Sequence, residues 1–126
     1  MKVERTRIIS NNRLYLLFRS FRIFTGDIIM HIGICCLKIY MEESHSLKDS
    51  RGITRSLVER VRNRFNVSAA EEANNNRWQT SDIVFCSVGN DIPYVSGQIS
   101  NMVTYIESLR LDFEIVDCSR EIISGI

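Results

Sequence analysis

The regular pattern of apolar and polar residues begins at Met30. Residues 30–40 are almost entirely apolar, which predicts a central strand buried on both faces or nearly so. Ser46 and Asp49 follow with the spacing of a helix-capping box, and apolar residues then recur at helical spacing up to about Phe65. The pattern therefore predicts a buried strand followed by an amphipathic helix.

The rest of the chain repeats this order of elements. A short strand begins at 67–70 and a longer one runs over 77–88. Gly89-Asn90-Asp91 then breaks the strand and offers an N-cap to a second helix with Pro93 in its first turn. A last strand is predicted over 113–118. The order strand, helix, strand, strand, helix, strand indicates an α+β, ferredoxin-like fold, a four-stranded antiparallel sheet with two helices on one face.

The predicted fold leaves the other face of the sheet without a covering helix. Because the predicted strands are so apolar, this face would form an exposed patch that invites a partner. A domain of this size also buries only a modest fraction of its surface. We therefore expect a homo-oligomer, at least a dimer, that pairs through this face.

The composition is that of a globular protein. Of 126 residues, 44% are hydrophobic and 25% are charged, which excludes a disordered or collagen-like chain. The net charge of +1 does not by itself indicate a nucleic-acid-binding protein. However, residues 1–30 carry six basic and two acidic residues, and residues 31–126 carry ten basic and thirteen acidic ones. Such asymmetry usually separates a tail from a folded unit.

The basic segment before the pattern has several interpretations. Its apolar run at 14–18 is interrupted by Arg19 and is too short to span a bilayer, and no cleavage site of a secretory signal follows. An organellar transit peptide would contain more serine. We interpret residues 1–29 as a disordered or spurious extension, 30–122 as one domain and 123–126 as a tail. We expect a cytoplasmic protein that does not contact a membrane.

The cysteines and histidines do not form a metal-binding pattern. No two cysteines have C-x-x-C spacing, and neither His31 nor His45 is spaced to complete a ligand set. We expect the cysteines to be small buried residues in a reducing compartment. No metal or cofactor is predicted.

One side of the first predicted helix is strongly basic. At 100° per residue, four basic residues fall within a sector of about 60° beside the apolar positions. We call them the basic stripe: Lys48, Arg51, Arg55 and Arg62. The stripe can bind a phosphate backbone or an acidic protein, or it can simply be solvated. Because Arg51 and Arg55 repel each other at this spacing, their clustering favours a function.

Two further residues are binding candidates. Trp78, at the start of a predicted strand, suits a core or edge anchor, and base stacking is the alternative. The central strand positions that would carry stacking aromatics in an RNA-recognition sheet are aliphatic or cysteine, which argues against that mode. His45 precedes Ser46, which suggests a base beside a nucleophile, but Ser46 is better explained as the helix cap. We see no catalytic set and expect a non-enzyme.

Several sequence blocks together resemble the YlxP-like family of small bacterial proteins. The resemblance covers about residues 30–122, in order and without large gaps, and the blocks that carry it are His45-Ser46-Leu47-Lys48, Arg51, Ser56-Leu57, Arg60–Glu71, Trp78-Gln79 and Val88–Asp91. The resemblance implies a ferredoxin-like fold and a start near Met30, but no established activity. It also implies a role in translation or ribosome maturation, because genes of this family commonly lie beside those for initiation factor two and ribosome-binding factor A.

The chain departs from the family pattern at three places. Ser50 stands where a basic residue is usual, Cys35-Cys36 replaces aliphatic residues, and the loop 73–77 is rich in asparagine. The leading hypothesis is a non-enzymatic protein that binds ribosomal RNA or a ribosome-associated factor through the basic stripe. The alternative is a small homodimeric structural or regulatory module. An enzyme with His45 as the base is the third hypothesis.

Overall fold

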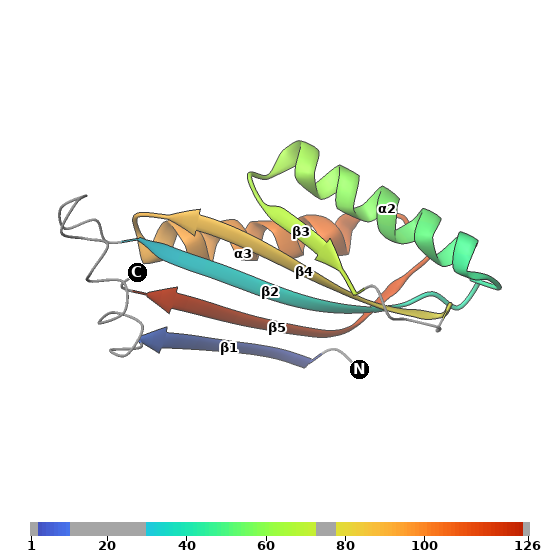
Figure 1. Ribbon diagram of the computed structural model, residues 1–126, viewed down its shortest axis with the longest axis horizontal. Helices are drawn as coiled ribbons and strands as arrows, with labels where there is room; N and C mark the ends of the chain where they lie inside the picture. The colour runs from blue at the N-terminus through green and yellow to red at the C-terminus, as the bar shows by residue number, and fades with distance from the viewer. Residues whose placement is uncertain (1–2, 11–29, 73–77, 125–126) are drawn as a thin grey trace.

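The computed structural model describes residues 3–10, 30–72 and 78–124, and of residues 3–10 it describes the backbone. Within these ranges the chain forms a five-stranded sheet and two helices (Figure 1). The elements in chain order are β1 (Val3–Ser10), β2 (His31–Tyr40), α2 (Leu47–Arg64), β3 (Ser68–Glu71), β4 (Thr80–Gly89), α3 (Ile92–Ser108) and β5 (Glu114–Ser124).

Four of the strands form the predicted antiparallel sheet. The strand order is β1-β5-β2-β4-β3, and β5-β2, β2-β4 and β4-β3 are all antiparallel neighbours. The helices α2 and α3 follow β2 and β4, so the β-α-β-β-α-β order is complete from β2 to β5. The prediction of a ferredoxin-like α+β fold is confirmed.

The structure adds a strand where the sequence pattern predicted no regular element. β1 pairs in parallel with β5, in a register that runs from Val3 opposite Asp117 to Ser10 opposite Ser124. Its sequence, VERTRIIS, places charged residues at both odd and even positions, so the period of two that marks a half-buried strand is missing. The unpaired edge of β5 supplies the hydrogen-bonding partners instead. Residues 11–29 lie outside the described residues.

The last strand is also longer than predicted. β5 continues through Ser124, whereas the pattern predicted a strand over 113–118 and a tail from 123. The polar run Ser119–Glu121 hid this continuation, because it breaks the apolar pattern. These residues extend the strand because β2 pairs with them on one side and β1 on the other. Residues 125–126 lie outside the described part.

Side-chain caps begin both helices at the predicted places. The Ser46 hydroxyl accepts a hydrogen bond from the Asp49 amide at 3.1 Å, and the Asp49 carboxylate accepts one from the His45 amide at 3.2 Å. At α3, the Asp91 carboxylate accepts a bond from the Tyr94 amide at 3.1 Å. These bonds satisfy amides at the first turns that have no partner within the helix.

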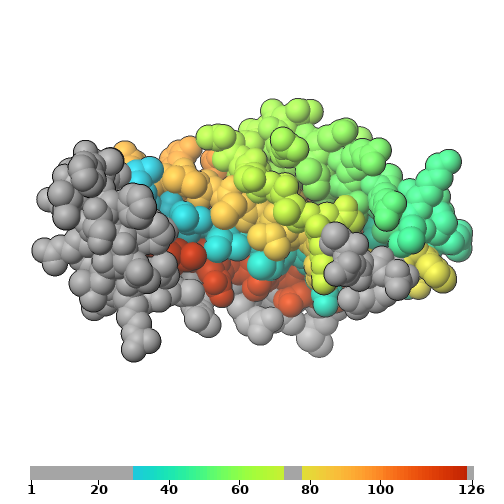
Figure 2. All heavy atoms as spheres, in the orientation of Figure 1, coloured from blue at the N-terminus to red at the C-terminus, as the bar shows by residue number. Residues whose placement is uncertain are grey.

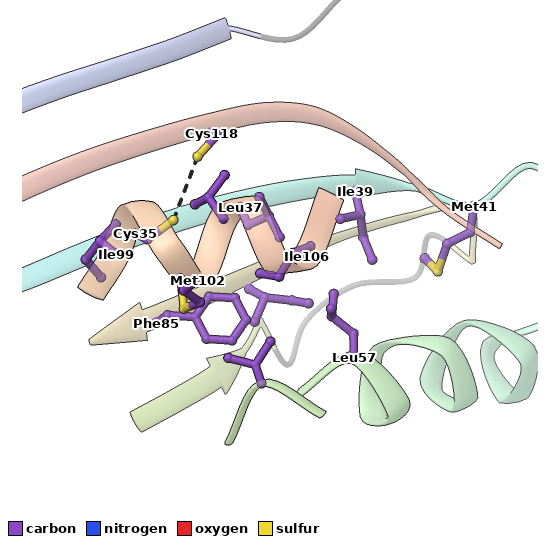
Figure 3. Close-up of a cluster of buried hydrophobic side chains, with 13 residues drawn as sticks. Cys35, Leu37, Ile39, Met41, Leu57, Phe85, Ile99, Met102, Ile106 and Cys118 are labelled. Carbon is purple, nitrogen blue, oxygen red and sulfur yellow. Dashed lines mark hydrogen bonds between the residues drawn. The ribbon is translucent and has the colours of Figure 1, made fainter. Parts of the chain in front are cut away.

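The core lies between the helices and one face of the sheet (Figure 3). Alternate residues of β2 and β4 are fully buried there, among them Leu37 and Phe85. Gly33 lets α3 approach β2 closely, because a Cβ at this position would lie 2.5 Å from a methyl group of Val95. The buried surface therefore comes from β2, β4, β5 and one side of each helix.

Two buried cysteines face each other in this core. The Sγ atoms of Cys35 and Cys118 lie 3.8 Å apart, and both residues are fully buried (Figure 3). This contact and burial raise the pKa of the Cys35 thiol far above its ordinary value. The thiol therefore stays protonated and unreactive at neutral pH.

The opposite face of the sheet is the open face. In Figure 2 the strands β2, β4 and β5 lie on the near side, and neither α2 nor α3 lies over them. Along β2, buried residues alternate with half-buried ones, and Cys36 is exposed. The prediction that this strand is buried on nearly both faces was wrong, because both helices pack on the same side of the sheet.

Candidate nucleic-acid interface

Helix α2 is held on the sheet by a narrow buried side. Its buried residues are Ser50, Thr54, Leu57 and Val61, which recur at helical spacing. Leu57 and Val61 are part of the main apolar core. The helix is therefore fixed by packing along most of its length.

A polar connection adds to this packing. The Thr54 hydroxyl lies 3.1 Å from one carboxylate oxygen of Glu71 in β3 and shares its hydrogen between this oxygen and the carbonyl groups of the preceding helical turn. The Ser81 hydroxyl of β4 donates to the other Glu71 oxygen at 3.1 Å. Thr54 and Ser81 are buried, so their hydroxyl groups need partners within the protein. The connection joins α2, β3 and β4. Sequence reasoning missed it, because nothing local links residues so far apart in the chain.

The basic stripe lies on the exposed side of α2. Lys48, Arg51, Arg55 and Arg62 are all exposed. Within the described part of the chain, none of them forms an ion pair. From Lys48 to Arg62 the helix rises roughly 21 Å. The four charges therefore form an extended positive surface that is available to an anionic ligand.

Two other arginines of α2 lie on a different side. On the helical projection Arg60 and Arg64 fall on the opposite flank of the buried side from the stripe. The guanidinium of Arg64 lies 4.6 Å from the centre of the Tyr105 ring of α3, and this ring also contacts Phe65. Arg64 is thus engaged in packing between the helices, through a cation–π contact.

His45 and Ser46 do not form a catalytic pair. The Ser46 hydroxyl accepts the Asp49 amide as the helix cap, and His45 is exposed one residue earlier. A nucleophile with its base also requires a third group that orients the base. Among the described residues no hydrogen bond to the His45 ring is present.

Trp78 is more exposed than a core anchor would be. The side chain is 48% exposed, and it precedes β4 instead of lying within it. The carbonyl of the next residue, Gln79, accepts the Met41 amide at 2.6 Å, which places this segment at the end of β2. Figure 1 shows that the N-terminal end of α2 lies at the same end of the molecule. The structure therefore brings Trp78 and His45 to one end and leaves Arg62 far from both.

The central positions of the open face carry no aromatic platform for bases. Ile34, Cys36, Val84 and Cys86 lie on it, as the sequence suggested. Burial and the neighbouring Cys36 thiol raise the pKa of Cys86. Further along, Lys38 pairs with Asp82 at 3.8 Å. Base stacking on the sheet is therefore not available at these positions.

The described residues contain neither a cluster of metal ligands nor a membrane-spanning helix. No three side chains of histidine, cysteine, aspartate or glutamate converge there as a metal site would require. Neither α2 nor α3 has the length and apolar character needed to cross a bilayer.

Comparison with known proteins identifies a family and adds no activity. The chain is 25% identical over 77 residues to the uncharacterized protein YlxP of Bacillus subtilis (strain 168), an alignment that covers 61% of this chain and 84% of the relative. A family model described as "Protein of unknown function (DUF503)" matches residues 32–120, which include α2 and both central strands. The resemblance to YlxP-like proteins is confirmed, and the chain belongs to the DUF503 family.

Proposed function

We propose that this protein is a non-enzymatic cytoplasmic RNA-binding protein whose basic stripe holds a phosphate backbone of ribosomal RNA. The observation that carries the proposal is the exposure of Lys48, Arg51, Arg55 and Arg62 along one side of a helix, with no ion pair to other described residues. Each such group can neutralise a phosphate and release a counterion. The ribosomal class of RNA is supported by the resemblance to a family whose genes lie among translation genes.

The attachment of α2 to the sheet supports the same proposal. Leu57 and Val61 are buried, and Thr54 is bonded to Glu71. The helix is therefore already in place before the ligand binds. A preformed surface avoids part of the entropy cost of binding. Phosphate contacts alone provide affinity with little sequence preference, so the ligand would be recognised mainly by shape and charge.

The test compares two variants with the same loss of charge. Arg51→Ala/Arg55→Ala removes the centre of the stripe, and Arg60→Ala/Arg110→Ala removes two exposed arginines elsewhere. Binding of a labelled stem-loop of ribosomal sequence is measured at several salt concentrations. The stripe variant should bind more weakly, and its slope of log affinity against log salt should fall by about 1.5 units. The control should behave much as the wild type does.

Two results would contradict the proposal. Equal losses of RNA affinity in both variants would show that only the net charge of the protein attracts the RNA. Tighter binding of a polyglutamate peptide than of the RNA, with the same dependence on Arg51 and Arg55, would make an acidic protein the ligand of the stripe.

The second candidate function is that of a homodimeric structural or regulatory module. The exposed side chains of the open face favour it, since Val84 is 39% and Val88 57% exposed, and Cys36 is exposed on the central strand β2. Pairing of two copies would remove this apolar surface from water. Sedimentation at micromolar concentration tests this candidate function. We expect a dimer that the Val84→Lys substitution dissociates. A wild-type protein that is a monomer at all concentrations would exclude the dimeric module.

A further inference from the structure

A hollow of about 320 Å³ lies where α3 ends and β5 begins. Its walls are mostly apolar and comprise Ile106, Leu109, Phe113 and Ile115. Two exposed carboxylates, Glu107 and Glu114, also line it. The hollow therefore combines an apolar surface with negative charge.

A second hollow of about 170 Å³ adjoins the first. It shares Phe113 and Glu114 with it, and Tyr40, Glu42, Glu43 and Asp112 form the rest of the lining. Among the described residues, no lysine or arginine lines either hollow. We call the two hollows together the acidic groove.

Four carboxylates of the acidic groove have no counterion among the described residues. Within the described residues, Glu42, Glu43, Asp112 and Glu114 form no ion pair. Arg110 is close in sequence but does not line the groove. Like charges gathered in this way repel one another, and an incoming cation would relieve that repulsion.

We propose that the acidic groove docks a short cationic segment of a partner protein, in which lysine or arginine alternates with large apolar residues. An apolar side chain would enter the hollow lined by Leu109 and Phe113. A cationic side chain would enter the hollow lined by Glu42, Glu43 and Asp112. An anionic partner would be repelled, and a purely apolar one would leave the carboxylates unmatched. This site is separate from the basic stripe, so it goes beyond the proposed RNA binding.

The test uses two synthetic peptides of equal length and charge. In one, arginine alternates with leucine, and in the other, arginine alternates with serine. The protein variants are Glu42→Gln/Glu43→Gln/Glu114→Gln and a control with the same charge change away from the groove, Glu59→Gln/Glu72→Gln/Glu121→Gln. Binding of each labelled peptide to the full-length chain is followed by fluorescence anisotropy.

The wild type and the control should bind the arginine–leucine peptide alike. The groove variant should bind it about tenfold more weakly, because each exposed charge contact contributes a small factor. The arginine–serine peptide should bind the wild type at least about tenfold more weakly, since it cannot fill the apolar hollow. This last comparison needs no variant, so it holds even if a substitution impairs folding.

Three outcomes would overturn the proposal. Equal affinity for the two peptides would show general attraction between charges. Equal losses in the groove variant and its control would show the same. Self-association of the free chain that the groove variant abolishes would identify a second copy, through its own basic residues, as the occupant.

Discussion

The buried hydroxyl of Thr54 in α2 and the carboxylate of Glu71 in β3 are joined by a hydrogen bond of 3.1 Å. On the helical projection Thr54 is the residue of the buried side that lies nearest to the basic stripe. Glu71 also accepts a bond from Ser81, so the same carboxylate reaches β4. These bonds attach α2 to β3 and β4, so they help to fix the rotation of the helix about its axis and the side on which the basic stripe is exposed.

Replacing Thr54 with valine should lower the free energy of unfolding by about 1 kcal/mol, because it removes a hydroxyl group that bonds to Glu71 while keeping the side-chain shape. Thr104→Val is the matched control, since Thr104 is exposed on α3. Urea denaturation of both variants provides the measurement. If the two variants are equally stable, the bond to Glu71 contributes nothing to holding the helix.

Removing the cap of α2 should destabilise the protein. Ser46→Ala leaves the Asp49 amide without its partner, and such changes typically cost about 1 kcal/mol. Ser46→Asp keeps an accepting oxygen and should restore most of the loss. Thermal melts of the three proteins decide the matter, and a Ser46→Asp protein as unstable as Ser46→Ala would argue against the cap.

The basic stripe should contribute little to stability. Arg51→Ala/Arg55→Ala is expected to change the free energy of unfolding by no more than about 0.5 kcal/mol, because both side chains are exposed and unpaired within the described residues. Because the two charges repel each other, their removal even favours a slight increase in the free energy of unfolding. Circular dichroism melts check this directly. Unfolding of the double variant would mean that these side chains have a structural role.

The buried thiols predict a loss of stability at alkaline pH. The pKa of Cys35 is raised in the folded state from an ordinary value of 9.0, so the native protein keeps a proton that the unfolded chain releases. Stability is therefore unaffected well below pH 9 and falls as the pH rises above it, by about 1.4 kcal/mol per pH unit for the Cys35 thiol. Denaturation between pH 7 and about 10 measures the decline. Cys35→Ala/Cys118→Ala should have a flatter profile, and an identical slope in this variant would exclude the thiols as the cause.

Removal of residues 1–29 should leave a folded domain. The main core comes from β2 to β5 and the two helices, and the deletion removes the parallel partner of β5. We expect cooperative unfolding with a somewhat lower midpoint and increased self-association, because an uncovered strand edge offers pairing to other chains. Analytical ultracentrifugation and thermal melts test both parts. A chain from Met30 that no longer unfolds cooperatively would show that β1 is essential.

Local signals in the sequence determined much of this protein. The capping pairs Ser46–Asp49 and Asp91–Tyr94 mark the starts of the helices, and the period of apolar residues sets their buried sides. These features depend on neighbours within one or two turns, so spacing alone reveals them. The sector occupied by the basic stripe follows from the same period, although its ligand does not.

Only the tertiary structure decided the features that join distant segments. The parallel pairing of Val3–Ser10 with β5, the bond from Thr54 to Glu71 and the contact of Cys35 with Cys118 connect parts of the chain that share no local pattern. The acidic groove likewise combines Glu42 and Glu43 with residues at the start of β5. Such arrangements arise from the order of strands in the sheet and from which face the helices cover, because those two choices determine which distant side chains meet.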